Sequence, residues 1–421
     1  MLVSVNLPDS PVSIQDSLDE LKSLAQAAGA KVVGYCKQNR RGIHPAYYVG
    51  RGKADEIAEW VEKTGANLVI FDNDLSPAQT RDLEEIIDCK VVDRSVLILD
   101  IFSSHAQTHE ANLQVDLALM QYTYPRLTRM WSHLDTVAGG ASSVGAIGTR
   151  GTGEKQLEID RRLVQKRISV LKKQINQIGQ RKKRQVKSRK NHFTVGLVGY
   201  TNAGKSTLLN ALTEVNTFVE DKLFATLDTK TAKWQLNQDH SVLLSDTVGF
   251  VRDLPHHLVA SFRATLEEAI HADLLLHVVD VSHAQAEHQV KSVNQVLREI
   301  GCDDKDTLFI LNKTDQPGSQ RVLDTWQTIY PEAIAMSAKT GKGIDLLTEA
   351  VMIRLTGRHL HLRIAYPASD GRIRNFVRAY GQVLSENYQD STVVLEAYLG
   401  TRQLPGLQYL RPTSYEVISP G

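Results

Sequence analysis

The sequence is poor in the residues that cross-link a chain or ligate zinc. It has three cysteines in 421 residues, Cys36, Cys89 and Cys302, which lie far apart and form no C-x-x-C pair. This spacing excludes a disulfide framework and argues against a zinc site. The sequence also has no apolar run of 18 residues, and its first residues lack the basic start and apolar core of a signal peptide. We therefore expect a cytoplasmic protein without a transmembrane segment.

What the sequence does have is a phosphate-binding loop of the pattern G-x-x-x-x-G-K-[ST]. It lies between an apolar run at 194–198, which predicts a buried strand, and a segment at 206–212, which predicts a helix. Glycines let backbone N–H groups approach phosphates, the helix N-terminus adds partial positive charge, the lysine reaches the outer phosphates and the serine hydroxyl ligates Mg²⁺. The residues predicted to bind nucleotide here are Gly199, Asn202, Ala203, Gly204, Lys205, Ser206 and Thr207.

Two downstream motifs predict that the base is guanine. N-K-x-D follows an apolar run at 308–311, and S-A-K follows another at 333–336. The carboxylate of N-K-x-D accepts two hydrogen bonds from guanine that adenine cannot supply, so ATP would leave it unpaired at a cost of about 1–3 kcal/mol. S-A-K is predicted to hold guanine from the other side. The residues of the two motifs are Asn312, Lys313, Asp315, Ser337, Ala338 and Lys339.

The stretch between these motifs contains the residues predicted to sense the terminal phosphate. Asp246 and Gly249 form D-x-x-G after a strand at 242–245, which places a carboxylate near the metal and an N–H near the phosphate. Thr226 is the candidate that closes over Mg²⁺, and its neighbours Thr217, Thr229 and Thr231 are the alternatives. We predict Lys205, Thr226 and Gly249 as catalytic residues, and Ser206 and Thr226 as metal ligands.

The sequence predicts slow hydrolysis by the free protein. Where Ras-like proteins place a glutamine that orients the attacking water, this chain has Phe250, which can neither orient water nor carry charge. Asn202 is similar to the asparagine that helps hold K⁺ in potassium-activated GTPases such as MnmE. The alternative is an asparagine that braces its own loop. Arg252 is a further candidate, because an exposed switch arginine can supply positive charge in cis.

Further parts are predicted around a GTPase domain at 192–358. That domain alternates strands and helices as in a doubly wound, mainly parallel sheet with nucleotide at the strand C-termini. Residues 1–104 predict a small α/β domain with helices at 17–28, 53–63 and 77–87 and strands at 31–35, 67–71 and 90–92. Residues 359–421 predict a small α/β unit with a strand at 361–365, a helix at 372–386 and a strand at 391–398.

Residues 105–190 predict a long antiparallel helical hairpin, because apolar residues recur there with gaps of three and four. Pro125 is expected to kink or interrupt the first helix. The tip at 137–153 has six glycines in seventeen residues and is expected to be mobile. The apolar positions are Leu113, Leu117, Met120, Tyr124, Leu127, Trp131 and Leu134, then Val164, Ile168, Leu171, Ile175 and Ile178.

The second half of the hairpin is strongly basic. Residues 150–190 contain fifteen Lys or Arg against three acids, although the whole chain has a net charge of only +1. Such a surface beside a GTPase domain predicts contact with RNA, and a solvated helix face is the alternative. Because no aromatic-rich or cysteine-rich RNA module is present, we expect contact with RNA backbone and shape. Residues 181–190 predict a basic linker into the GTPase domain.

Taken together, these motifs resemble those of the HflX family of translation-associated GTPases over essentially the whole chain. The matching segments are GYTNAGKST at 199–207, LFATLD at 223–228, DTVGF at 246–250, NKTD at 312–315, SAK at 337–339 and GTRGTGEKQLEIDRR at 148–162. The resemblance implies a GTPase that binds the large ribosomal subunit and its RNA, with the hairpin tip directed toward the peptidyl-transferase region. It also implies ATP-linked activity in the N-terminal domain, for which the sequence offers no second nucleotide motif.

Two functions fit this sequence. In the first, GTP binding sets a conformation that splits stalled or stressed ribosomes into subunits, and hydrolysis resets it. In the second, the protein is a GTP-gated RNA-binding or ribosome-assembly module that splits nothing. Both require GTP as substrate and Mg²⁺ as cofactor, K⁺ is a further candidate ion, and we expect a monomer.

Overall fold

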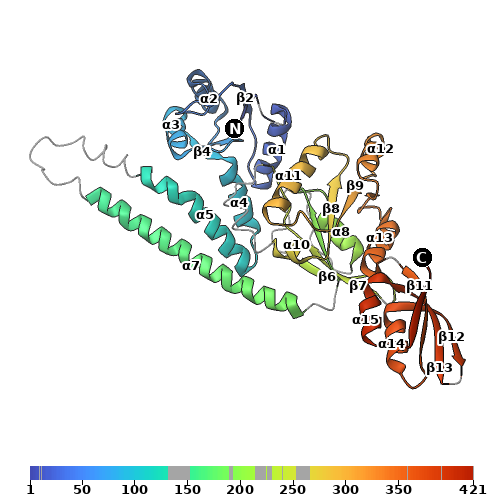
Figure 1. The fold of residues 1–421 in the computed structure, drawn as a ribbon. Coiled ribbons are helices and arrows are strands. Elements are labelled where there is room, and N and C mark those ends of the chain that lie inside the picture. The colour runs from blue at the N-terminus through green and yellow to red at the C-terminus, as the bar shows by residue number, and fades with distance from the viewer. Residues whose placement is uncertain are drawn as a thin grey trace, which may run out of the picture.

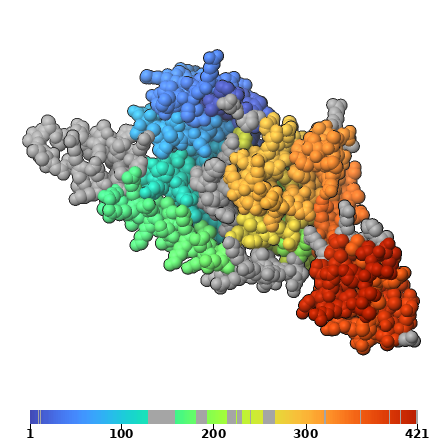
Figure 2. All heavy atoms as spheres, viewed as in Figure 1, coloured from blue at the N-terminus to red at the C-terminus, as the bar shows by residue number. Residues whose placement is uncertain are grey.

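The computed structural model describes residues 1–421 except 9, 11, 131–151, 189–192, 214–223, 225–229, 239, 253–265, 358, 390 and 421. An N-terminal unit, a helical hairpin, the GTPase domain and a C-terminal unit follow one another (Figure 1). The C-terminal unit forms a separate lobe at the end of the molecule away from the hairpin (Figure 2). Among the described helices, none combines the length and apolarity needed to cross a membrane.

The N-terminal unit is a four-stranded parallel sheet of order β2-β1-β3-β4. Its strands are β1 (Leu2–Asn6), β2 (Tyr35–Asn39), β3 (Leu68–Phe71) and β4 (Lys90–Asp93). Its helices are α1 (Ile14–Ala27), α2 (Arg51–Thr64), α3 (Pro77–Ile87) and α4 (Arg94–His105). The bounds predicted for α3 are confirmed, since Ser76 and Gln79 form a reciprocal capping box at its start.

Two predictions for this sheet were wrong. The first strand, β1, was not predicted, and the strand expected at 31–35 lies instead at Tyr35–Asn39. β2 is an edge strand in which only Cys36 is buried, so it carries little of the apolar signal that identifies strands. The apolar residues before it do not join the sheet.

The predicted hairpin is confirmed as α5 (His109–Met130) packed on α7 (Thr152–Ser188). The apolar seam between the helices contains Leu113, Leu117 and Leu171, with Met120, Ile168, Ile175 and Ile178 around them. Helix α5 continues through Pro125, so the expected interruption was wrong. The linker expected at 181–190 is helical as far as Ser188. Residues 137–151 of the predicted tip lie outside the described residues.

The GTPase domain is a six-stranded sheet of order β10-β9-β8-β5-β7-β6, in which only the pairing of β6 with β7 is antiparallel. This arrangement confirms the predicted doubly wound, mainly parallel sheet. Its strands are β5 (Thr194–Gly199), β6 (Lys230–Gln235), β7 (Ser241–Asp246), β8 (Leu274–Asp280), β9 (Thr307–Asn312) and β10 (Ile334–Ala335). The described helices are α8 (Lys205–Leu212), α10 (Glu267–His271), α11 (Ala286–Glu299), α12 (Gln320–Ile329) and α13 (Ile344–Thr356).

The C-terminal unit is a four-stranded antiparallel sheet of order β12-β13-β11-β14 with the connectivity of a ferredoxin-like β-α-β-β-α-β fold. The helix expected at 372–386 ends at Tyr380, because the chain from Gly381 pairs along β13 instead. α15 and β14 were not predicted. The elements are β11 (His359–Pro367), α14 (Gly371–Tyr380), β12 (Gly381–Gln389), β13 (Thr392–Gly400), a 3₁₀ turn (Thr401–Gln403), α15 (Leu404–Tyr409) and β14 (Ser414–Pro420).

A histidine lies in the core of the central strand β8. His277 is 1% exposed, and its ring stacks on Phe309 with 4.8 Å between centroids. Burial, together with the nearby charge of Lys205, lowers the pKa of His277 from 6.5 to about 3. The imidazole is therefore neutral in the folded protein at every pH at which the domain is expected to work.

We expect His277 to make the GTPase domain sensitive to acid. Between pH 6.5 and about 3 the unfolded chain binds a proton on His277 that the folded chain does not. Stability therefore falls as the pH drops through this window, by about 1.4 kcal/mol per pH unit. In His277→Leu this component disappears, so the difference in urea midpoint between variant and wild type changes from pH 7.5 to pH 5.

The matched control is His271→Leu, which removes a histidine exposed at the end of α10. Its difference from wild type should stay constant over the same pH range. A constant difference for His277→Leu as well would contradict the neutral burial of His277.

Candidate active site

Two glycines allow the phosphate loop to pass between neighbouring strands. Gly199 ends β5 at φ 151°, and a Cβ there would meet the carbonyl oxygen of Val278 in β8 at 2.3 Å. Gly204 caps α8 at φ 97°, and a Cβ there would lie 2.3 Å from Nδ2 of Asn312. No side chain fits at either position without a shift of the backbone. The backbone N–H groups at the start of α8 are consequently open to an anion.

Lys205 is folded back into the loop. Its Nζ donates to the carbonyl oxygens of Gly199 at 3.1 Å and Tyr200 at 2.8 Å, and the side chain is buried. Burial lowers the pKa of Lys205 to about 8, and the carboxylate of Asp246 opposes this effect. A phosphate near the ammonium group would supply the counter-charge that burial removes, which is the role predicted for Lys205.

The predicted metal ligands include a hydroxyl and a carboxylate in direct contact. Oγ of Ser206 donates to Oδ2 of Asp246 at 2.7 Å, which joins the start of α8 to the end of β7. Hydroxyl and carboxylate oxygens are ligands that Mg²⁺ prefers, so the residues present fit this ion. Thr226 lies outside the described residues. In the described part of the chain, no cluster of three His, Cys, Asp or Glu side chains forms another metal site.

The base side of the site is tied to the phosphate loop by Asn312. Its buried amide donates from Nδ2 to the carbonyl oxygen of Ala203 at 2.8 Å and accepts at Oδ1 from the N–H of Ala338 at 2.9 Å. Lys313, at a left-handed φ of 63°, pairs with Asp280 at 2.7 Å. The structure thus brings the predicted N-K-x-D and S-A-K motifs together at one end of the sheet.

Asp315 is exposed beside these residues. A hydrogen bond from Ser337, with smaller contributions that include Lys339, lowers the pKa of the Asp315 carboxyl. The carboxylate is therefore ionised at neutral pH and accepts hydrogen bonds, as the predicted reading of guanine requires. Thr207 lies in the first turn of α8, and Lys339 is exposed on the loop after β10.

The backbone of D-x-x-G lies directly on the phosphate loop. The N–H of Thr201 donates to the carbonyl oxygen of Phe250 at 2.7 Å, and the N–H of Phe250 donates to that of Gly199 at 3.2 Å. A Cβ on Gly249 would lie 2.7 Å from Cα of Thr201 and 3.1 Å from Nζ of Lys205. Gly249 is therefore next to the predicted phosphate contacts, where its role as a phosphate sensor requires it to be.

The expectation of an exposed Arg252 was wrong. Its side chain is only 13% exposed and pairs with Asp72 of the N-terminal unit at 3.3 Å and with Glu20 at 3.7 Å. Sequence reasoning also missed Tyr200, whose hydroxyl donates to Glu20 at 2.6 Å. No local pattern identifies these pairs, because the partners are about 180 residues or more apart in the chain.

Comparison with known proteins agrees with this geometry. Three family models match in succession: GTP-binding GTPase N-terminal at 15–103, GTP-binding GTPase Middle Region at 105–189 and 50S ribosome-binding GTPase at 194–313. GTPase HflX of Lacrimispora saccharolytica is 42% identical over 401 residues, which cover 95% of this chain and 93% of the relative. The chain belongs to the HflX family of GTPases. GTPase HflX of Escherichia coli strain K12 is 43% identical over 86% of this chain and 84% of its own.

Membership of this family makes GTP the substrate and hydrolysis to GDP and phosphate the reaction. Among solved structures, the GTP-binding protein of the archaeon Sulfolobus solfataricus in complex with GDP is 24% identical and has a TM-score of 0.43. It covers 84% of this chain and 98% of its own. A likeness of this degree adds nothing to the family assignment.

We expect Asp315→Asn to exchange the base preference of this GTPase. An amide donates where the carboxylate accepts, so GTP should bind roughly ten- to a hundredfold more weakly and xanthosine triphosphate more tightly. Calorimetric titration with the two nucleotides measures both changes. Asp324→Asn, on the exposed side of α12, removes one carboxylate as a control. Unchanged affinity of Asp315→Asn for GTP would remove Asp315 from the base pocket.

Proposed function

We propose that this GTPase binds the large ribosomal subunit through ribosomal RNA and, in its GTP-bound state, separates stalled or stressed ribosomes into subunits. It acts as a monomer in the cytoplasm, and hydrolysis returns it to the state that leaves the ribosome. The observation that carries this proposal is the basic outer side of α7. Its exposed cations are Arg161, Arg162, Lys166, Arg167, Lys172 and Lys173.

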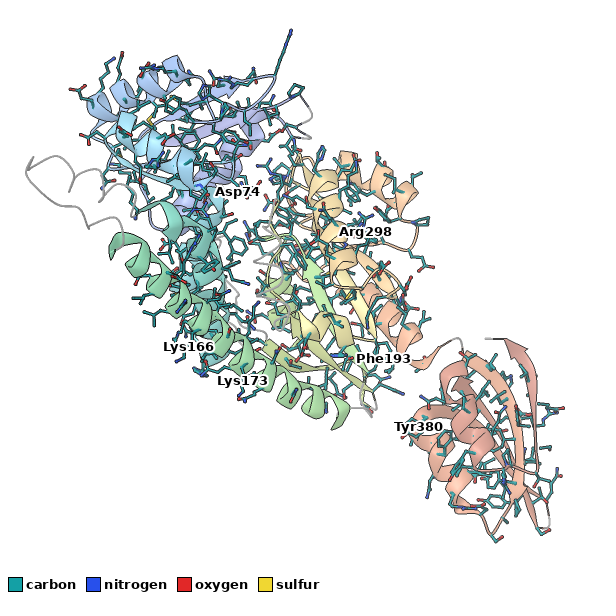
Figure 3. All side chains as sticks on the ribbon, turned by 60° about the vertical axis from the view of Figure 1, so that its left-hand side comes forward. Asp74, Lys166, Lys173, Phe193, Arg298 and Tyr380 are labelled. Carbon is teal, nitrogen blue, oxygen red and sulfur yellow. The ribbon has the colours of Figure 1, made fainter. Side chains whose placement is uncertain are left out.

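The position of these cations favours a large polyanionic partner. Lys166 and Lys173 lie on the outer side of α7, along one edge of the molecule (Figure 3). Arg162 pairs with Glu158 in its own helix, and Arg167 lies 4.0 Å from Asp116 of α5, so the acids nearby offset few of the charges. A helix that presents a row of such groups fits an RNA backbone. The family model that describes a 50S ribosome-binding GTPase supports the same partner.

The proposed site roles follow from the contacts of its own residues. Lys205 binds the outer phosphates, the N–H of Gly249 contacts the terminal phosphate, and Asn312 with Asp315 orients guanine. Mg²⁺, held by Ser206 and Thr226 when nucleotide is bound, neutralises charge on the phosphates. Phe250 is 3% exposed and packs in a hydrophobic cluster, so it does not orient water. Slow hydrolysis by the free protein follows, with acceleration by the large subunit.

Sedimentation of ribosomes tests the splitting activity. We expect 70S particles to separate into subunits with the protein and a non-hydrolysable GTP analogue, but not with GDP. In Lys172→Glu with Lys173→Glu, binding should weaken and lose about one unit of salt-dependence slope per phosphate contact, while ribosome-free hydrolysis stays unchanged.

The control for this variant is Lys63→Glu with Lys291→Glu, the same charge change at exposed lysines of α2 and α11. It should bind and split as the wild type does. Binding to the large subunit without separation of 70S particles would favour the alternative, a GTP-gated RNA-binding or assembly module. An unaltered salt dependence in the α7 variant would show that the basic side is only solvated.

We also propose that K⁺ assists hydrolysis beside Asn202. This residue is exposed in the phosphate loop and has a left-handed φ of 60°. The rate should be higher in K⁺ than in Na⁺ at equal ionic strength, and Asn202→Ala should abolish the difference. Asn202→Gly, which tolerates this φ, should do the same without backbone strain. Equal rates in both salts, with and without ribosomes, would refute the ion's role.

A further inference from the structure

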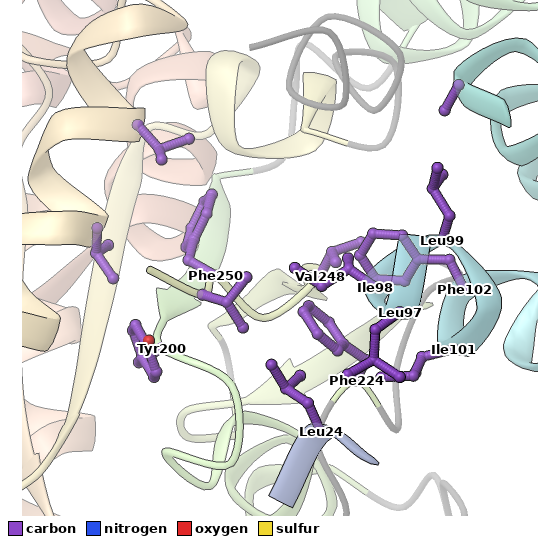
Figure 4. Packing of buried hydrophobic residues seen from close by; sticks show 14 of the residues in the cluster. Leu24, Leu97, Ile98, Leu99, Ile101, Phe102, Tyr200, Phe224, Val248 and Phe250 are labelled. Carbon is purple, nitrogen blue, oxygen red and sulfur yellow. The ribbon is translucent and has the colours of Figure 1, made fainter. Parts of the chain in front are cut away.

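The N-terminal unit and the switch region of the GTPase domain share one hydrophobic cluster. Leu97, Ile98 and Phe102 of α4 pack with Phe224 and Phe250 (Figure 4). The rings of Phe102 and Phe224 meet edge to face, with 4.6 Å between centroids. The two units are therefore joined where the GTPase domain is predicted to respond to nucleotide.

A buried polar network lies beside this cluster. Arg94 of the N-terminal unit pairs with Asp72 and with Glu20, each at 2.7 Å. Arg252 enters the same network from the GTPase domain, through Asp72 at 3.3 Å and the hydroxyl of Ser17 at 2.8 Å. The side chains of Asp72 and Arg94 are 4% and 2% exposed. At this depth a cation without its carboxylate is strongly disfavoured.

The network contains two carboxylates and two guanidinium groups, and only one of these cations belongs to the GTPase domain. If the N-terminal unit separates from the GTPase domain, Arg94 stays with Asp72 and Glu20, whereas Arg252 loses both. The GTPase domain then carries an arginine that has lost these two carboxylates and lies close to its own phosphate loop.

The backbone holds Arg252 next to that loop. The N–H of Arg252 donates to the hydroxyl of Tyr200 at 2.7 Å, and Tyr200 is the loop residue after Gly199. Phe250, two residues before Arg252, is bridged to Tyr200 along the backbone. Arg252 also lines a cavity of about 360 Å³ together with Tyr200, Thr201 and Asn202, and Glu20 stands at its wall. The guanidinium therefore has a path to the phosphate loop that crosses no other element of the described chain named in this cavity.

We propose that Arg252 contacts the phosphates during GTP hydrolysis, and that the docked N-terminal unit holds it away from them. In the reaction, water attacks the terminal phosphorus, the bond to the bridging oxygen breaks, and GDP and phosphate leave. Arg252 exchanges no proton, because a guanidinium stays charged; it neutralises negative charge that builds up on the phosphate oxygens. The inference rests on GTP hydrolysis and is independent of ribosome binding.

The alternative is that Arg252 only braces the two units. The two roles predict opposite signs for one substitution, because Asp72→Asn and Arg252→Ala break the same ion pair. If Arg252 contacts phosphate, Asp72→Asn raises ribosome-free kcat at saturating GTP, by fivefold or more, and Arg252→Ala does not. The double variant then has the low kcat of Arg252→Ala.

The test measures kcat for these three variants, for Arg252→Lys and for Glu20→Gln, which removes the other carboxylate near Arg252. Glu59→Gln is the control, since this exposed residue of α2 pairs only within its own helix through Lys63 in the contacts of the described chain. Thermal unfolding and GDP affinity establish that each variant is folded and binds nucleotide. If Asp72→Asn does not fold, Glu20→Gln takes its place in the double variant.

Arg252→Lys should recover part of the rate that Arg252→Ala lacks, because it keeps the charge without the planar fork. Three results would overturn the proposal. Arg252→Ala could be as fast as Asp72→Asn, the double variant could keep the gain of Asp72→Asn, or neither carboxylate variant could exceed wild type. Each would leave GTP hydrolysis itself and the ribosome experiments unaffected.

Discussion

The geometry of the active site depends on the side-chain amide of Asn312. One end of this amide holds the phosphate loop through Ala203, and the other holds the guanine side through Ala338. Gly204 passes so close to it that no Cβ fits between them. Because the amide is buried, its loss would leave two polar backbone groups unpaired, at about 1–3 kcal/mol each. The spacing between the phosphate and base halves of the site is thus fixed before nucleotide arrives.

The same end of the sheet connects the site to the rest of the chain. Phe250 is hydrogen-bonded to the phosphate loop through its backbone and packs against the N-terminal unit through its ring. Tyr200 belongs to the loop itself and donates to Glu20 of α1. A displacement of either unit must therefore change contacts of the phosphate loop. Packed interfaces of this kind switch between discrete arrangements rather than deform gradually.

The sequence allowed the active site to be predicted because its motifs are short and follow strands. A parallel sheet brings the ends of β5, β7 and β9 to one edge, so motifs far apart in the chain meet in space. Edge strands such as β2 carry little apolar signal, and the segment from Gly381 has a helix-like pattern until it pairs with β13. The second apolar side of α5, which includes Val115 and Tyr122 and packs in the α4 cluster, was missed for a related reason. Its partner lies in another unit, so a single-helix pattern does not reveal it.

The order in which strands pair in the GTPase sheet has a consequence for synthesis of the chain. β5 ends at Gly199, but its neighbour β8 is complete only at Asp280. At about 5–20 residues per second, the phosphate-loop strand waits for roughly 4–16 s beside the ribosome without that partner. The α4 side chains of the shared cluster wait longer, because Phe250 is made some 150 residues after Phe102. A nascent chain stopped between these points would expose an apolar helix face that the finished protein covers, and such a face is a target for chaperones.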